Sequence, residues 1–213
     1  MKRLPTILAA VSAAALVLTG QLPDGARLPA WSVAGHAVGR ALVTPGGSIE
    51  TFGYFTQIDG YPESVLFLGA PSEQNARFTF RSDRARIFSL ANNGVFLLRL
   101  IPLAEESTVY RVYFDTSPDQ DFNRPQTFSD SPVIATFAVR GGSLTVVPGA
   151  LSTYTAVMDL TSSHPVVFGG VSVDARLLVD AIRVSLTGPA LAEPREGNIA
   201  SIPFAGAVYA VRK

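Results

Sequence analysis

From about residue 48 onward, polar and apolar side chains alternate along short runs that are separated by turn residues. In 77–81, Phe78 and Phe80 fall on one face, whereas Arg77 and Arg81 fall on the other. A period of two residues is typical of a β-strand with one buried face. Because such runs recur at short spacing and no long helical pattern accompanies them, the sequence predicts an all-β fold.

The same alternation continues in 108–115, where Tyr110 and Val112 point one way and Arg111 and Tyr113 the other. The next stretch, 117–132, has little periodicity and is rich in Pro and Asp. We predict an ordered loop or a short helical turn there.

Segment 171–187 fits two patterns, a helix ended by Gly188 and Pro189 or two strands joined by a bulge. The helix would carry several β-branched residues in its interior, which helix propensity disfavours. In the strand interpretation the alternation changes phase at 181–182, so that Ile182, Val184 and Leu186 face inward, as a bulge allows. We therefore predict strand, bulge, strand.

Two glycine turns complete the pattern. Asn93-Gly94 separates two apolar runs and is a strong hairpin signal, and Gly141-Gly142 predicts a second hairpin between 133–140 and 144–147. Roughly ten strands in about 165 residues favour one antiparallel domain. We predict a β-sandwich or a closed β-barrel.

The N-terminal sequence has the pattern of an export signal. A basic start at 1–3 precedes an apolar run over 4–18, which fits a secretory signal and is shorter than the ~20 residues of a membrane-spanning helix. We assign 1–37 to the signal and a spacer, with cleavage near Gly20 or Ala37, and 38–213 to the β-domain. The protein is then periplasmic or extracellular and keeps no stable membrane anchor after cleavage; an uncleaved signal anchor is the alternative.

Composition restricts the chemistry. The chain has no Cys and 2 His, and its lysines are Lys2 and Lys213. Thiolate nucleophiles, His-rich metal sites and internal lysine chemistry are therefore excluded. The 17 basic and 17 acidic residues balance, which gives no reason to expect nucleic acid as a partner.

An acidic loop offers one candidate metal site. Asp119, Asp121 and Asn123 alternate, so their oxygens can converge on Ca²⁺. Position six of the corresponding EF-hand-type pattern is Arg124 rather than Gly, and the alternative is a turn in which these side chains cap backbone N–H groups. We expect no other cofactor.

A second candidate site is basic. Arg77, Arg81 and Arg111, with Tyr113 and Asp115, lie on or beside two predicted strands and predict a ligand or anion site. The alternative is a solvated sheet face on which arginines prevent edge-to-edge association.

These observations favour an exported, non-enzymatic β-module that binds a ligand or a cell-envelope component, or that has a structural role. An exported hydrolase or isomerase using Asp, Glu, Tyr or Arg chemistry is the alternative. A small outer-membrane β-barrel is a minor alternative, since the last strand lacks a terminal aromatic residue.

Overall fold

The computed structural model describes residues 27–92, 95–102, 108–190, 193–195 and 197–212. The predicted export signal and the Asn93-Gly94 turn lie outside the described residues. The helical elements are α1 (Glu63–Leu66), η1 (Glu73–Asn75), η2 (Pro125–Phe128) and α2 (Ala175–Leu178). The strands are β1 (Val33–Val43), β2 (Ser48–Ile58), β3 (Phe78–Ser82), β4 (Ala85–Asn92), β5 (Phe96–Pro102), β6 (Val109–Phe114), β7 (Val133–Val147), β8 (Leu151–Ser163), β9 (Val166–Phe168), β10 (Val171–Val173), β11 (Ala181–Pro189), β12 (Glu193–Arg195) and β13 (Asn198–Val211).

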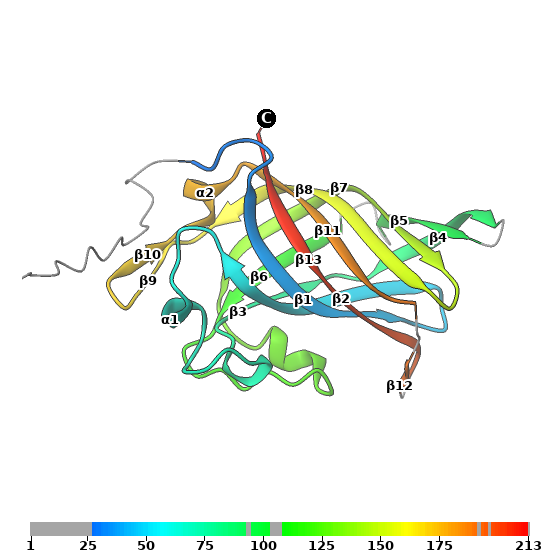
Figure 1. The fold of residues 1–213 in the computed structure, drawn as a ribbon, viewed down its shortest axis with the longest axis horizontal. Coiled ribbons are helices and arrows are strands. Elements are labelled where there is room, and N and C mark those ends of the chain that lie inside the picture. Colours follow the sequence, from blue (N-terminus) through cyan, green and yellow to red (C-terminus); the bar gives the residue numbers. More distant parts are fainter. Residues whose placement is uncertain (1–26, 93–94, 103–107, 191–192, 196, 213) are drawn as a thin grey trace, which may run out of the picture.

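Within these ranges, eight antiparallel strands close a barrel in the order β1, β13, β11, β8, β7, β6, β3, β2. The circle closes where β2 pairs with β1. The antiparallel β4–β5 pair continues the wall between β2 and β7, at the end of the molecule opposite to α2 and the β9–β10 hairpin (Figure 1). The all-β prediction is confirmed, and the barrel is the architecture that forms.

Strand alternation fills the barrel interior. Ile182, Val184 and Leu186 of β11 are buried in the main core, as predicted, and Tyr110 and Val112 of β6 join them there. The intervening side chains face outward. One face of each strand therefore builds the core while the other builds the outer wall.

Two glycines let the interior pack closely where β1 and β2 pair. Gly39 lies opposite Gly53 in this ladder. A Cβ atom on Gly39 would lie 2.7 Å from the ring of Phe204, and one on Gly53 would lie 2.8 Å from the ring of Phe80. These two rings stack with centroids 6.4 Å apart. The missing side chains thus make room for two aromatic ones.

A second, small core lies on the outer side of β1 and β2. Phe128 of η2 packs against Phe52 and Leu42, and the Phe128 ring stacks on Phe122 with centroids 5.0 Å apart. Thr79 donates to the Phe128 carbonyl over 3.0 Å. The segment predicted as an ordered loop or short helical turn is thus a cover over the barrel wall, and it includes η2.

Two local predictions need correction. Gly141-Gly142 does not form a hairpin, because β7 runs through both residues and pairs with β8 on each side. The chain turns later, at 148–150. In 171–187 the strand predicted before the bulge ends at Val173, and α2 follows it, where the Asp174 side chain caps the helix by accepting from Arg176 N–H.

The N-terminal strand begins earlier than the sequence suggested. Residues 33–37, assigned to the spacer, belong to β1, which pairs with both β2 and β13. Leu28 is buried at 2% exposure. Cleavage at Ala37 would therefore remove part of a barrel strand. No helix among the described residues is long and apolar enough to cross a membrane.

Candidate functional site

A charged cleft of about 350 Å³ lies on the outer wall of the barrel. We call it the arginine cleft. Its lining residues come from β2, β3, β6 and the segments that follow β3 and η2: Glu50, Arg81, Ser82, Asp83, Arg84, Arg111, Tyr113 and Ser129. Arg81 and Arg111 are directly paired in the β3–β6 ladder, so strand register alone places two guanidinium groups side by side.

Two carboxylates hold the guanidinium groups of the arginine cleft. Glu50 contacts Arg81 Nε and lies 3.5 Å from Arg84 Nε. Asp83 accepts from both terminal nitrogens of Arg111, at 2.6 and 3.5 Å. The Glu50 side chain is only 10% exposed, whereas that of Arg84 is 62% exposed. The fixed pairs set the shape of the cleft, and Arg84 presents a guanidinium group to solvent.

The protonation states in the arginine cleft follow from its contacts. The hydrogen bond to Asp83 raises the pKa of Arg111, so this side chain remains a cation. Burial raises the pKa of Tyr113, against the opposing effects of Arg111 and Arg81. Tyr113 is therefore a neutral phenol at neutral pH, able to donate to an anion.

The other two residues of the predicted anion site lie elsewhere. Arg77 donates to the Thr116 carbonyl over 3.0 Å, and its guanidinium carbon lies 4.2 Å from the ring centroid of Phe168. Burial lowers the pKa of Arg77, with Asp115 acting in the opposite direction. Asp115 accepts from Ser117 N–H at 2.8 Å. These residues anchor the segment after β6 and do not reach the arginine cleft.

The predicted calcium loop uses its oxygens locally. One Asp121 oxygen accepts from Asn123 N–H at 2.8 Å, and the other accepts from Arg124 Nε at 3.1 Å. These two contacts lower the pKa of Asp121, the first more strongly. The observed contacts are those of the capping turn that was the alternative to a calcium site.

A different set of carboxylates gathers beside this loop. Oxygens of Asp115, Asp119 and Asp130 lie within 4.8 Å of one another. Burial, followed by the charges of Asp119 and Asp115, raises the pKa of Asp130. Only Asp119 is shared with the three residues predicted from the sequence, so calcium binding stays a prediction.

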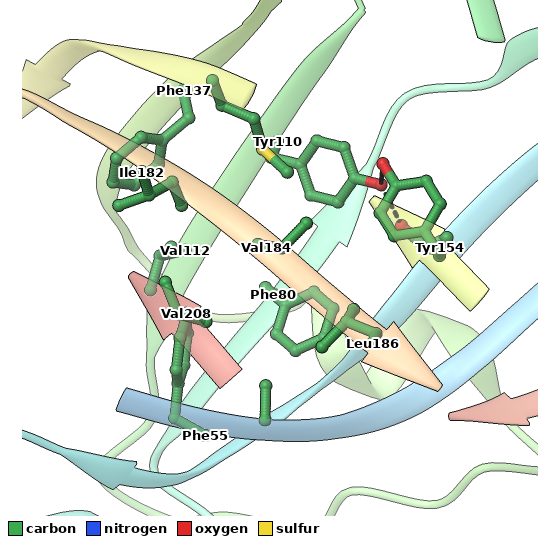
Figure 2. A pocket seen from close by; sticks show the side chains of 13 residues that line it. Phe55, Phe80, Tyr110, Val112, Phe137, Tyr154, Ile182, Val184, Leu186 and Val208 are labelled. Carbon is green, nitrogen blue, oxygen red and sulfur yellow. Dashed lines mark hydrogen bonds between the residues drawn. The ribbon is translucent and has the colours of Figure 1, made fainter. Parts of the chain in front are cut away.

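The barrel interior contains a group of buried side-chain hydroxyls. Tyr110 and Tyr154 meet with their hydroxyl oxygens 2.6 Å apart (Figure 2). Thr51 Oγ1 lies within hydrogen-bond distance of two hydroxyl oxygens, 2.6 Å from that of Tyr110 and 3.2 Å from Ser82 Oγ. We call these four side chains the hydroxyl row. Burial raises the pKa of both tyrosines, that of Tyr154 well above its usual value.

Three cavities follow one another along the interior. The threonine cavity, about 10 Å³, and the tyrosine cavity, about 40 Å³, share Thr51, Tyr110 and Tyr154 as walls. The end cavity, about 80 Å³, shares five apolar wall residues with the tyrosine cavity: Phe55, Val112, Phe137, Ile182 and Val208. Each volume is far below the ~300 Å³ of an ordinary ligand pocket. The interior is therefore a nearly filled core, and the arginine cleft has the size of a ligand site.

Several of these residues escaped the sequence analysis. Glu50 lines the arginine cleft because β2 pairs with β3, and Thr51 and Tyr154 meet Tyr110 across the barrel. The alternation in 108–115 did indicate that Arg111 and Tyr113 share a face. Nothing in the local pattern indicates which distant strand faces them.

Comparisons with models of protein families, with curated proteins and with solved structures found no match for this chain.

Proposed function

We propose that this protein is an exported, non-enzymatic binding module whose ligand carries an anionic group and occupies the arginine cleft. The observation that carries the proposal is the convergence of Arg81, Arg84 and Arg111 on one cleft of about 350 Å³. A guanidinium group binds carboxylate, sulfate or phosphate through several N–H donors in a fixed geometry.

The charge balance of the arginine cleft supports this ligand class. Three arginines face two carboxylates, Glu50 and Asp83, which leaves one positive charge in excess. Because the acids fix Arg81 and Arg111 in place, an incoming anion need not order them itself, which lowers the entropic cost of binding. Tyr113 adds a hydroxyl group for a polar ligand, whereas Ser129 Oγ accepts from Arg81 and donates to the Gln126 carbonyl.

Because the proposed protein is exported, its ligand belongs to the molecules that occur outside the cytoplasm. The basic start and apolar run at the N-terminus support export. Acidic glycans and phosphate-bearing envelope components offer the required anionic group. The equal numbers of basic and acidic residues in the chain give no support to nucleic acid as the ligand.

The enzymatic alternative receives less support from the arrangement of side chains. Both carboxylates of the arginine cleft, Glu50 and Asp83, are bound by arginine. An arginine contact favours the charged form of a carboxylate, which suits ligand positioning better than proton donation. Asp119 and Asp121 contact Arg124 at another place on the surface.

The outer-membrane alternative conflicts with the outward side chains of β8 and β11. Arg183 is exposed between inward-facing residues of β11, and Asp159 of β8 pairs with Arg140 of β7. Thr153 and Thr187 contact each other on the same wall. A lipid-facing wall would require an apolar band at such positions.

The proposal is tested by measuring the binding of galacturonate, inorganic sulfate and inorganic phosphate to the full chain by calorimetry. At least one anion should bind, and its affinity should fall as salt is added. Arg84→Gln should weaken it by roughly tenfold, the effect of losing one charge-assisted contact of about 1.5 kcal/mol. Arg183→Gln on β11 is the matched control and should leave binding unchanged. Equal affinities in the two variants, or no binding of any of the three anions, would refute the proposal.

A further inference from the structure

A row of exposed side chains leads away from the arginine cleft along β4 and β5. Ile49 of β2 is paired with Ala85 of β4, and both residues belong to the main core. The neighbouring pair, Ser48 and Arg86, therefore projects from the outer face of the wall, as Glu50 does. Arg86 thus continues the surface on which the arginine cleft lies.

The row continues through the pairing of β4 with β5. Phe88 follows Arg86 on the same face and is 53% exposed. Its partner in the ladder is Arg99, which is also exposed. At a rise of about 3.4 Å per residue, Phe88 lies about 14 Å along the chain from Arg84 of the cleft. We call Arg86, Phe88 and Arg99 the arginine strip, which β4 and β5 carry toward one end of the molecule (Figure 1).

The arginines of the strip form no ion pair within the described part of the chain. Neither Arg86 nor Arg99 takes part in the ion pairs observed there, and the sequences of β4 and β5 contain no acidic residue. The strip therefore adds two positive charges to the one in excess in the cleft. Positive charges in a row favour a ligand with several anionic groups along its length, because each further contact forms within the same complex.

The uncharged groups of the strip favour a chain of sugars. The face of the Phe88 ring carries partial negative charge and attracts C–H groups, which cover one face of a pyranose ring. Arg99 is paired with Ser143 of β7, and the Ser143 hydroxyl lies 3.1 Å from that of Thr155. Guanidinium groups, an aromatic face and hydroxyl groups thus lie side by side. These are the groups that bind carboxylates, sugar rings and sugar hydroxyls.

We propose that the ligand is a polysaccharide of uronic acid units, whose chain runs from the arginine cleft along the arginine strip. One carboxylate occupies the cleft at Arg84, and later carboxylates of the same chain contact Arg86 and Arg99. A sugar ring between them covers Phe88. This inference rests on the function proposed for the cleft and adds that the ligand is a polymer held over a longer surface.

The test compares galacturonate with hexagalacturonate by calorimetry on the full chain. The double variant Arg86→Gln/Arg99→Gln should weaken hexagalacturonate binding roughly tenfold, about threefold for each exposed charge contact, and leave galacturonate binding unchanged. Phe88→Leu keeps an apolar side chain without the ring and should weaken only the hexamer, by about threefold. The matched control Arg176→Gln/Arg183→Gln removes two exposed arginines elsewhere and should change neither affinity. Arg84→Gln should weaken both ligands.

The outcomes separate the strip from the cleft. If Arg86→Gln/Arg99→Gln binds hexagalacturonate as tightly as the unaltered chain does, the strip is not a binding surface, and the anion site in the cleft stands. If Arg84→Gln weakens neither ligand, the function proposed for the cleft is wrong. Hexaglutamate and hexathymidylate carry comparable charge without pyranose rings. Equally tight binding of either, or no binding of hexagalacturonate, would overturn the assignment to a polysaccharide.

Discussion

The arginine cleft and the hydroxyl row are built on the same strands but lie on opposite sides of the barrel wall. On β6, Tyr110 points into the interior and Arg111 into the cleft. On β2, Thr51 joins the hydroxyl row and its neighbour Glu50 pairs with Arg81. A shift of one residue along either strand therefore exchanges an enclosed hydrogen-bonding site for an open, charged one.

The two sites differ in how their polar groups are satisfied. In the arginine cleft, charges pair with one another and the exposed nitrogens of Arg84 meet solvent. In the hydroxyl row, Tyr110 and Tyr154 are buried and contact each other and Thr51. Interactions in the cleft are therefore weak, screened by salt and easily exchanged for those of a ligand. Interactions in the interior are strong, and a missing partner is costly.

The largest expected effect comes from Phe80, on the inner face of β3. Phe80→Ala should lower the free energy of unfolding by about 3–5 kcal/mol, because it leaves a cavity in the core. Phe80 is 6% exposed and stacks on Phe204. Chemical denaturation measures the loss, which should be the same at low and high salt. Anion binding at the arginine cleft should be unchanged, and a loss of it would show that the two faces are not independent.

The second effect concerns Arg81, on the outer face of the same strand. Arg81→Gln leaves Glu50, whose side chain is 10% exposed, with the distant Nε of Arg84. We expect a loss of about 1–3 kcal/mol, the cost of a buried polar group deprived of its partner. Denaturation of Glu50→Gln, Arg81→Gln and the double variant forms a cycle. The double variant should be more stable than Arg81→Gln alone, and additivity would disprove coupling between the two side chains.

Much of this architecture was predictable from alternation alone. The pattern in 77–81 and 108–115 identified both strands and both faces, because side-chain direction in a strand is fixed by the backbone. The pattern also placed Ile182, Val184 and Leu186 in the core, which the structure confirms. These predictions succeeded because each depends on one strand and its immediate burial.

Long-range pairing was not predictable in the same way. Arg77 and Arg81 share a face in the alternation of 77–81, yet Arg77, just before β3, is covered by the segment after β6 and Arg81 lines the arginine cleft. The Gly141-Gly142 prediction was wrong because β8 pairs along the whole of β7. Both outcomes depend on which distant segment packs against a strand, and this information is absent from local periodicity.

The third effect concerns Tyr154 in the barrel interior and appears at alkaline pH. Burial and the adjacent Tyr110 raise the pKa of Tyr154 well above 10, so the unfolded chain loses this proton before the folded one does. The contribution of Tyr154 to the free energy of unfolding should therefore be constant below about pH 10 and fall as the pH rises above it. Denaturation of Tyr154→Phe across this range should show a shallower fall. Tyr209→Phe is the control, and an equal flattening in both variants would contradict the assignment.

The smallest effect lies in the acidic cluster of Asp115, Asp119 and Asp130. Because burial and two neighbouring carboxylates raise the pKa of Asp130 in the fold, the stability this group contributes is present below about pH 4 and is lost as the pH rises through its folded pKa. At neutral pH, Asp130→Asn should therefore stabilise the protein. Since the residue is exposed, the gain should be only about 0.2–0.5 kcal/mol. Thermal denaturation should detect this gain in stability at pH 7 and not at pH 3.

The Asp130→Asn variant, measured with and without Ca²⁺, also tests the calcium site predicted from the sequence. The Asp121 carboxylate already accepts hydrogen bonds from Asn123 and Arg124, so a cation bound by Asp119, Asp121 and Asn123 would have to break them. A cation bound beside Asp130 would instead relieve the repulsion between neighbouring carboxylates. If millimolar Ca²⁺ raises the melting temperature, Asp130→Asn should remove that rise and Asp121→Asn should preserve it. The reverse result would favour the trio Asp119, Asp121 and Asn123. An unchanged melting temperature in the unaltered chain would identify the loop as a capping turn, in which carboxylates satisfy backbone N–H groups instead of binding a metal.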